Sequence, residues 1–423
     1  MSNSASHLAF YSSPRFFKQL SCFKRIQIYD LDWSKILLVD AYRCFANPNW
    51  VEYQSGHPKH WAAQFGMIRF FLRQLLWRRE SFRTEVTANN AIDFLFFKSL
   101  QRPDYDRLFQ SAMQSVPNGK RVLSIDILSP QADFNWRAMF QFAMHIRQLL
   151  RLVVDLGAFE GFYFYCNSIR YSTLIASLRK FKPQMAVVFA DMQPIDNAIA
   201  QSFKQRGIKT ATLQHGLYVD YGNAETINRA NYENVVCDYF LAWGERTAEL
   251  ILQHHPTTVT VNCGHPALEA TRHEPGQGGN FFVFLDQKIF AKENQRLLDI
   301  AAAFAEATGW VGHVGVHPRD SLSQYRIASD LLNNASHPWK SCSFAIGHSS
   351  SIVYQALRAG LVVFQMNSDV PRHHLPKEWT FDNGQDLLKK WKTDANAEAL
   401  GKLFISEVGE KAASNYRHFF ATL

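Results

Sequence analysis

Polar residues that can transfer protons or bind anions follow several short apolar runs of the sequence, at points where a buried strand would end. The first such segment is Gln214-His215-Gly216. A histidine there can remove a proton from an acceptor hydroxyl near neutral pH, and a glycine lets a ligand approach the backbone closely. A turn that carries a polar histidine explains the segment equally well, so both interpretations stay open.

Two later segments suit a phosphate group. In His317-Pro318-Arg319 the proline holds the histidine extended and the arginine supplies a fork-shaped cation. The triplet Ser349-Ser350-Ser351 precedes an expected helix whose free N–H groups and hydroxyls form an anion site, and His348 adds a titratable donor. An X-Pro turn and simple helix capping are the alternatives. A fourth segment, Gly264-His265-Pro266, is typical of an exit turn, and we expect it to be structural.

These segments need elements that bring them together, and the sequence from about residue 160 alternates short apolar strands with amphipathic helices. This alternation predicts parallel, doubly wound α/β sheets. Because polar residues at the carboxyl ends of such strands face a common cleft, we expect the segments to meet there. The expected strands are 161–166, 185–189, 209–213, 239–243, 259–263, 281–285, 311–316, 344–347 and 361–365. The expected helices are 172–181, 194–206, 246–254, 293–308, 350–358, 385–391 and 396–419, the last broken at Gly409.

The segment 272–280, rich in glycine and proline, divides this pattern in two. We therefore expect an N-terminal Rossmann-like acceptor domain over 1–271 and a C-terminal Rossmann-like donor domain over 281–405. A final helix within 406–423 is expected to pack back on the first domain. Two such domains facing each other across a cleft form the expected architecture.

The first third of the chain is less regular. Residues 35–41 and 121–127 have the pattern of buried strands, and residues 65–83 and 139–156 predict two basic amphipathic helices. A basic face beside an aromatic one suits a helix that lies on anionic lipid. A packed helix with solvated arginines is an equally good interpretation.

The composition excludes several classes of protein. The chain has 423 residues, a formal net charge of +8 and 34 phenylalanines, which indicates acidic partners such as phosphates or an anionic membrane face. No apolar stretch is long enough to span a membrane, the start lacks a secretory signal, and the six cysteines form no CxxC pair. No GxGxxG, P-loop or HExxH motif is present, so we expect no resident cofactor and no metal. No aromatic-basic recognition motif is recognisable, so nucleic acid is not an expected partner.

The order QHG, GHPALE, HPRD and GHSSSIVYQALRAG over residues 183–366 resembles bacterial cell-surface polysaccharide glycosyltransferases of the GT-B fold. The HP and SS motifs are similar to those of bacterial sialyl-, polysialyl- and Kdo-transferases and of teichoic-acid glycerophosphotransferases. The resemblance implies a metal-independent nucleotide-sugar donor and inversion at the anomeric carbon. It implies that His317 and Ser349 to Ser351 take the donor phosphate, and that His317 can protonate the leaving phosphate. The HGTP pattern is not met, because Leu217 and Tyr218 follow Gly216.

An inverting transfer needs a base for the acceptor hydroxyl, and His215 is the first choice. Asp191, which a helix N-cap explains equally well, comes next, followed by the loop candidates Asp220 and Glu225. Asp286 is expected to cap or to touch the nucleotide. The acceptor is expected to be a growing glycan or a lipid-linked oligosaccharide, and the enzyme to be bacterial and cytoplasmic with peripheral contact to the membrane. A CDP-polyol phosphotransferase and a sugar-nucleotide 2-epimerase are the alternative activities, and the oligomeric state stays open.

Overall fold

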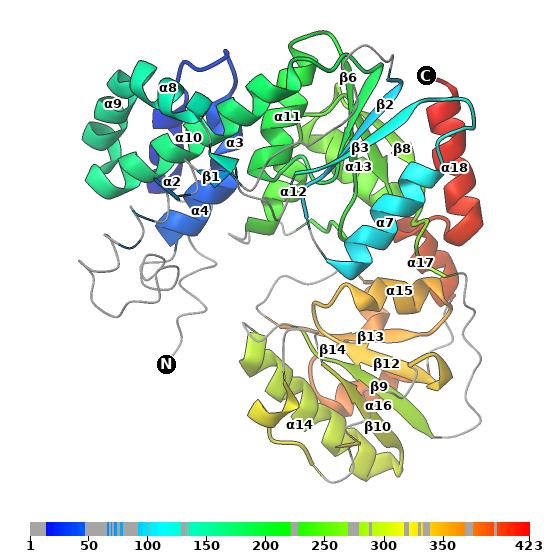
Figure 1. Ribbon diagram of the computed structural model, residues 1–423. Coiled ribbons are helices and arrows are strands. Elements are labelled where there is room, and N and C mark those ends of the chain that lie inside the picture. The colour runs from blue at the N-terminus through cyan, green and yellow to red at the C-terminus, as the bar shows by residue number, and fades with distance from the viewer. Residues whose placement is uncertain are drawn as a thin grey trace.

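A computed structural model supplies the structure of the chain (Figure 1). The described residues are 14–46, 92–100, 102–127, 133–134, 136–220, 227–269, 279–286, 290–316, 321–328, 331–332, 339–368, 375–392 and 396–423, with a few isolated residues between 66 and 78. The linker expected at 272–280 lies almost entirely outside them.

The first unit is built on a six-stranded parallel sheet with the order β3-β2-β5-β6-β7-β8. Its strands are β2 (Phe94–Lys98), β3 (Val122–Asp126), β5 (Met185–Val188), β6 (Lys209–Leu213), β7 (Tyr239–Ala242) and β8 (Val259–Asn262). The helices around it are α7 (Pro103–Gln114), α11 (Pro194–Lys204), α12 (Ala230–Glu233) and α13 (Glu245–His254). Every strand of this sheet that the sequence predicted is confirmed within two residues, and β2 and α7 are additional.

The second unit is a further six-stranded parallel sheet with the order β11-β10-β9-β12-β13-β14. Its strands are β9 (Asn280–Phe284), β10 (Val311–Gly315), β11 (Leu331–Leu332), β12 (Phe344–Gly347), β13 (Val363–Met366) and β14 (Thr380–Phe381). Its helices are α14 (Ala291–Thr308), α15 (Ile352–Arg358) and α16 (Gly384–Lys390). Short 3-10 turns cover Ile227–Arg229, Leu322–Gln324, Trp339–Ser341 and Lys377–Trp379. Both units therefore have the predicted doubly wound α/β class.

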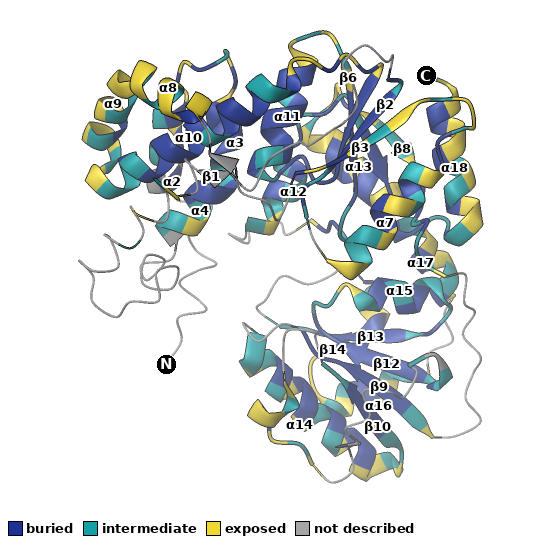
Figure 2. Cartoon of the chain, viewed as in Figure 1, coloured by how far each residue is buried: buried dark blue, intermediate teal, exposed yellow. Residues whose placement is uncertain are grey.

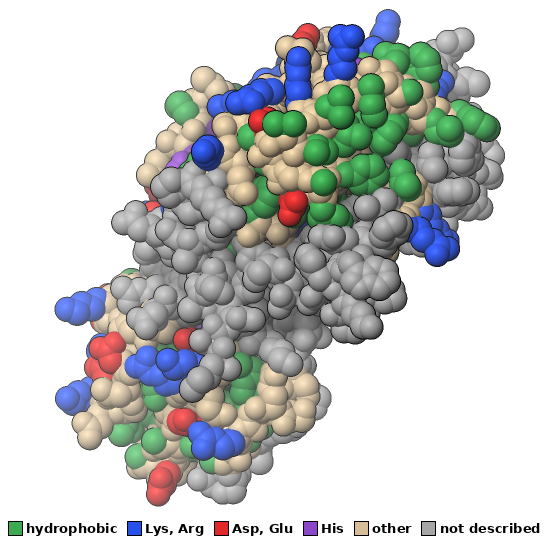
Figure 3. All heavy atoms as spheres, turned by 90° about the vertical axis from the view of Figure 1, so that its left-hand side faces the viewer, with side chains coloured by type: hydrophobic (Ala, Val, Ile, Leu, Met, Phe, Trp, Pro, Cys, Tyr) green, Lys and Arg blue, Asp and Glu red, His purple; other side chains and the backbone are tan. Residues whose placement is uncertain are grey.

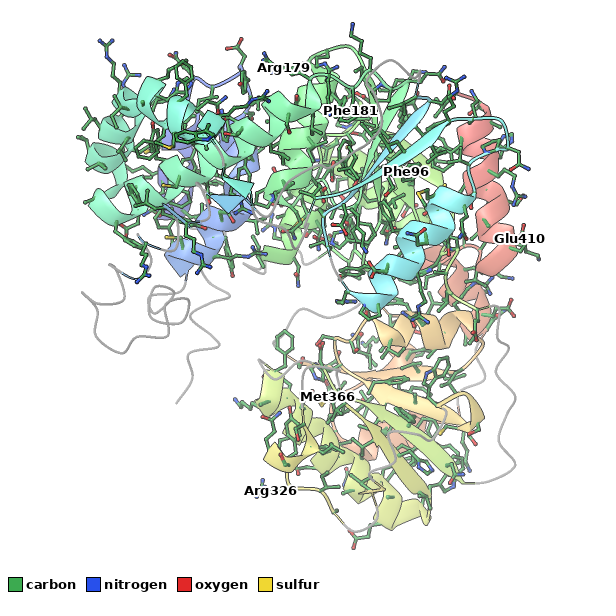
Figure 4. All side chains as sticks on the ribbon, viewed as in Figure 1. Phe96, Arg179, Phe181, Arg326, Met366 and Glu410 are labelled. Atoms are coloured by element: carbon green, nitrogen blue, oxygen red, sulfur yellow. The ribbon has the colours of Figure 1, made fainter. Side chains whose placement is uncertain are left out.

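The end of the chain leaves the second unit and returns to the first. Helix α17 (Ala397–Phe404) packs on α15 and α13, and α18 (Gly409–Ala421) lies against the first sheet, where the ring of Phe420 contacts Phe94 and Phe96 at 5.1 and 5.8 Å. The backbone N–H of Ser406 donates to the carbonyl of Trp243 (2.8 Å) at the crossing. Figure 4 labels Phe96 on the sheet and Glu410 on the outer side of α18.

A separate helical layer flanks the first sheet, where the sequence predicted two strands. It contains α2 (Pro14–Phe23), α3 (Trp33–Ile36), α4 (Leu38–Ala46), α8 (Trp136–Met144), α9 (Ile146–Leu156) and α10 (Ala158–Leu178). The strands expected at 35–41 and 161–166 are wrong, because these residues belong to α3 to α4 and to α10. Asp32 starts α3 by accepting the N–H of Ser34 (3.1 Å). Helix α10 is buried along most of its length, so it shows the continuous apolar pattern of a buried strand.

The two basic helices predicted in this region have different outcomes. The helix expected at 139–156 is two helices, α8 and α9, which meet at His145. The helix expected at 65–83 lies mostly outside the described residues. Within it, the isolated described residues Gly66, Arg69, Leu72 and Arg73 are helical. A short strand, β1 (Trp77–Arg78), follows and pairs antiparallel with β4 (Asp133–Phe134).

Figure 2 shows that the inner strands of the two sheets and α10 are buried, while the edge strands β3 and β8 and the outer faces of the surrounding helices are partly exposed. One apolar core runs through both sheets and the returning C-terminal helices, and the helical layer has a core of its own. Among the described residues, no helix combines the length and the apolar character needed to cross a membrane.

Candidate functional site

A cavity of about 310 Å³ lies between the two units. The first unit contributes the start of α7 and the loops that follow β6, β7 and β8, and the second contributes the start of α15. The lining residues are Arg102, Asp104, Tyr105, Arg107, Leu108, His215, Gly216, Leu217, Trp243, His265, Ala267, Leu268, Ser351, Gln355 and Ile405. A neighbouring hollow of about 580 Å³ shares Arg107, Ala267, Leu268 and Gln355 with it, so the two form one continuous cleft.

His215 stands in the wall of this cleft, directly after the carboxyl end of β6. Its Nδ1 is hydrogen-bonded to the hydroxyl of Tyr218 (2.9 Å), and the rings of Tyr105 and Phe189 lie 6.1 Å from it. Because Nδ1 is engaged, Nε2 is the ring nitrogen left for a substrate. The sequence predicted that His215 follows a strand and faces the cleft, and the structure places it there.

The surroundings of His215 keep its imidazole neutral. Burial, together with the smaller effect of the positive charge of Arg102, lowers its pKa to about 4. A neutral imidazole can accept a proton, so His215 is in the protonation state that a general base needs at pH 7.

Gln214 and Gly216 support His215 in different ways. The buried amide of Gln214 donates to the carbonyl of Gly216 (2.8 Å) and to the hydroxyl of Thr247 (3.2 Å), and accepts from the N–H of Trp243 (2.6 Å). Gln214 therefore ties together the loops after β6 and β7 and does not face a ligand. A Cβ at Gly216 would meet no atom within 4 Å, so this glycine leaves open space beside the imidazole.

His265 combines the expected structural role with a place in the cleft wall. Its backbone N–H donates to the carbonyl of Glu407 (2.8 Å), which holds the returning chain against β8. Its ring packs on Trp243 with 4.3 Å between centroids, and burial lowers its pKa to about 4. Its Nδ1 and the Nε1 of Trp243 have no hydrogen-bond partner among the described residues. The exit-turn interpretation is thus correct for the backbone, but it did not predict that the side chain of His265 lines the cleft.

The carboxylates proposed as alternative bases lie elsewhere. Asp191 is buried, and its carboxylate accepts the backbone N–H groups of Val236 (2.8 Å) and Cys237 (3.1 Å), so it positions the chain that leads into β7. Burial raises its pKa in spite of these bonds. Asp220 is exposed and does not line the cavity, and Glu225 lies outside the described residues.

The second unit holds a connected polar network beside β12. The hydroxyl of Ser349 donates to the carboxylate of Asp286 (2.5 Å) and lies 2.8 Å from Nδ1 of His348, whose Nε2 is 2.7 Å from the amide oxygen of Asn294. Burial lowers the pKa of His348 to about 4. Asp286 and Ser349 thus lie together at the carboxyl ends of β9 and β12.

The structure describes some of the other proposed phosphate ligands but not all of them. Ser351 lines the cavity at the start of α15, and Ser350 precedes it. His317 and Arg319 lie outside the described residues. Helix α15 begins at Ile352, two residues later than expected, and the hydroxyl of Ser351 does not cap it.

Cleft residues that sequence reasoning missed come mainly from α7. The guanidinium of Arg102 lies 3.9 Å from the ring centroid of Tyr105, and its Nε donates to Asp104 (2.6 Å). Arg107 forms no ion pair with any described residue, and Gln355 of α15 is a further polar lining residue. The sequence signals for this helix were Pro103 at its first position and the acidic Asp104 and Asp106 in its first turn.

Acid conditions are expected to destabilise the protein through its buried neutral histidines. An unfolded histidine binds a proton below about pH 6.5, whereas folded His348 does so only near its pKa of about 4. The free energy of unfolding therefore falls as the pH drops from 6.5 to 4, by up to about 1.4 kcal/mol per pH unit for this residue, and levels off below that window.

Urea unfolding at pH 7.5, 6 and 5 measures the slope of the free energy of unfolding against pH. His348→Gln should reduce the slope and His418→Gln, on the exposed side of α18, should leave it unchanged; an equal slope in all three proteins would contradict the assignment.

Within the part of the chain that the structure describes, no three His, Cys, Asp or Glu side chains converge as a metal site. The polar side chains that line the cavity include the hydrogen-bond donors Arg102, Arg107, Ser351 and Gln355 and the carboxylate of Asp104. The neighbouring hollow adds further carboxylates, those of Glu269, Glu398, Glu407 and Glu410.

No protein family's sequence profile matches the chain, and no curated protein matches it in sequence. Solved structures that resemble it include the UDP-GlcNAc 2-epimerase of Methanocaldococcus jannaschii in complex with UDP-GlcNAc and UDP, with 12% identity over 79% of this chain and 100% of that one and a TM-score of 0.47. Arabidopsis thaliana UGT89C1 complexed with UDP-L-rhamnose has 10% identity over 79% and 99% of the two chains and a TM-score of 0.43. The spinosyn rhamnosyltransferase SpnG has 12% identity over 78% and 96% and a TM-score of 0.38. At such identities and TM-scores nothing about activity follows from these neighbours.

Proposed function

We propose that the protein is an inverting, metal-independent glycosyltransferase that moves a sugar from a nucleotide-sugar donor to a glycan or lipid-linked acceptor. The observation that carries this proposal is the neutral imidazole of His215 at the end of β6, opposite Ser351 and Gln355 of the second unit across one cavity. A displacement at an anomeric carbon requires a base for the acceptor hydroxyl and hydrogen-bond donors for the leaving phosphate.

In the proposed reaction, Nε2 of His215 takes the proton of the acceptor hydroxyl. The acceptor oxygen then forms a bond to the anomeric carbon on the face opposite the nucleotide. The bond between that carbon and the diphosphate oxygen breaks, and its electron pair stays on the leaving nucleotide. Ser351 and the guanidinium of Arg107, which forms no ion pair with any described residue, are available to hydrogen-bond the phosphates. His317 and Arg319 keep the same role in the proposal.

The network of Asp286, Ser349 and His348 supports the donor side of this proposal. Its side chains fix the loop between β12 and α15 and thereby position Ser351. The carboxylate of Asp286 accepts a hydrogen bond from the hydroxyl of Ser349. Asp286 is therefore a positioning residue, because it holds this serine in place.

The experiment that tests the proposal follows nucleotide release from UDP-, CMP-, GDP- and CDP-activated donors, with and without acceptor glycans, in the presence of EDTA. Acceptor-dependent release with inverted product configuration supports the proposal. Release of a phosphodiester product from a CDP-polyol would instead identify the polyol phosphotransferase activity, and loss of turnover in EDTA would contradict metal independence.

A second candidate function is a sugar-nucleotide 2-epimerase. The observation that favours it is His265, a second neutral imidazole in the wall that holds His215, because an epimerisation needs two proton-transfer steps. This activity predicts that the configuration at C2 of the sugar nucleotide changes without any acceptor. Incorporation of deuterium at C2 in heavy water would detect this change. Retention of the C2 proton together with acceptor-dependent transfer would exclude it.

The cellular setting remains part of the proposal. The acceptor class, growing capsule, lipopolysaccharide or exopolysaccharide chains, and the bacterial cytoplasmic location rest on the resemblance of the sequence motifs.

A further inference from the structure

The outer faces of α8 and α9 expose a set of large apolar side chains. On α8, Trp136 and Phe140 are 71% and 68% exposed, and on α9, Leu150 and Val154 are 61% and 84% exposed. Residues four apart on a helix share one face, so these side chains form stripes along both helices. Met139, Met144 and Ile146 extend the same surface, which we call the α8–α9 face. Figure 3 views the molecule from the side of these helices and shows hydrophobic side chains gathered there.

This exposure belongs to helices that are firmly packed on their inner sides. Ala138 of α8 and Leu152 of α9 are buried against the helical layer. The amide of Gln141 donates to the hydroxyl of Tyr29 (2.8 Å) and accepts the hydroxyl of Ser172 (2.6 Å). The apolar face therefore belongs to well-packed helices, and its burial against a binding partner would be favourable.

The charges around the α8–α9 face are positive. Arg137, Arg147 and Arg151 are exposed on the same two helices. The one acidic residue in these helices, Asp155, is paired with Arg25 (3.1 Å). On the adjoining α2, Phe17 is 53% exposed, and the exposed Lys18 follows it.

We propose that the α8–α9 face binds an anionic lipid surface. Tryptophan and phenylalanine enter the boundary between headgroups and acyl chains, and arginines beside them reach back to lipid phosphates. A second copy of the chain fits this face less well, because pairing it with itself would bring like-charged arginines together.

The position of the face agrees with this role. In Figure 1, α8 and α9 lie at the edge of the molecule, and α7 and α15, which line the cleft, lie away from them. Binding through α8 and α9 thus leaves the residues that line the cleft uncovered.

Co-sedimentation of the full chain with vesicles tests the proposal without any substrate. We expect binding to phosphatidylcholine vesicles that contain 30% phosphatidylglycerol at low salt, and at least tenfold weaker binding to pure phosphatidylcholine or in 0.5 M salt. Arg147→Ala with Arg151→Ala should weaken binding roughly 25-fold, since each basic residue near an anionic surface contributes about fivefold. Phe140→Ser with Leu150→Ser should weaken it at least tenfold.

Matched controls come from exposed positions on α13. Leu252→Ser and Arg246→Ala change one apolar and one basic side chain outside the face and should bind like the unaltered protein. Equal circular dichroism and thermal midpoints show that each variant is folded. Brominated acyl chains should quench the fluorescence of the unaltered protein, and Trp136→Phe should lose that quenching. Equal binding to neutral and anionic vesicles, no vesicle binding, or a dimer that the Phe140→Ser, Leu150→Ser variant dissociates would overturn the proposal.

Discussion

Replacing His215 by glutamine is expected to lower kcat of sugar transfer by about 10²- to 10⁴-fold, the range that a positioned general base contributes. Glutamine is close in size and polar, so the hydroxyl of Tyr218 keeps a partner and the fold should not change. Nucleotide affinity should change less than threefold, because the proposed phosphate contacts come from other side chains, Ser351 and Arg107. Initial rates and calorimetric titration of the same preparation separate the two quantities.

The control for this variant is His418→Gln, which changes an exposed histidine of α18 and should leave kcat unaltered. The pH profile adds a second readout. Because burial lowers the pKa of His215 to about 4, the neutral base persists in mild acid, so the acid limb of kcat/KM should lie well below pH 6.5. An acid limb near 6.5, or a His215→Gln variant with full activity, would show that another group removes the proton.

Gly264→Ala is expected to cost roughly 3–5 kcal/mol of stability, at the upper end of single substitutions. Gly264 has a φ of +83°, which strains a residue with a side chain, and an added Cβ would lie 2.3 Å from the carbonyl oxygen of Glu407. That carbonyl accepts the N–H of His265, so the returning chain would have to move away from the strand end. Since His265 lines the cleft, kcat should fall together with stability. Urea unfolding measures the change.

Gly309→Ala separates the two contributions to that loss. Gly309 has a φ of +70°, but a Cβ there would meet no atom within 4 Å, so only the backbone strain of about 1 kcal/mol applies. A Gly264→Ala variant that loses no more than the Gly309→Ala variant would mean that the contact with Glu407 is not tight.

The sequence predicted the fold best where strands are short and bounded by clear signals. Beyond residue 185, strand-length apolar runs such as β5 end beside prolines, glycines or helix caps, and length separates strands from helices. The same criterion failed at α10, because a helix buried on most sides lacks the polar face that reveals its period. Strand β2, FLFFK, could have been recognised from its apolar run.

The candidate site was predictable only in part, for a reason that lies in chain topology. His215 could be placed because a residue after a parallel strand faces the cleft. Arg102, Tyr105 and Arg107 could not, because they reach the cleft through α7, which the pairing of β2 with β5 brings next to a segment about ninety residues later. Gln214 was only a candidate for the acceptor side or the loop, and its burial and three hydrogen bonds show that it connects two loops.

The most direct test of the central claim, that the cleft between the two sheets binds a nucleotide-sugar, is calorimetric titration of the protein and two tryptophan variants with UDP, CDP, CMP and GDP. Ser351 is exposed at the start of α15 and lines the cavity, so Ser351→Trp fills the cleft without disturbing the core. Ser414→Trp makes the same change on the exposed side of α18. We predict that one nucleotide binds the unaltered protein and the Ser414→Trp variant alike and binds Ser351→Trp at least 100-fold more weakly. Equal binding by all three proteins, or binding of no nucleotide by the unaltered protein, would contradict the account.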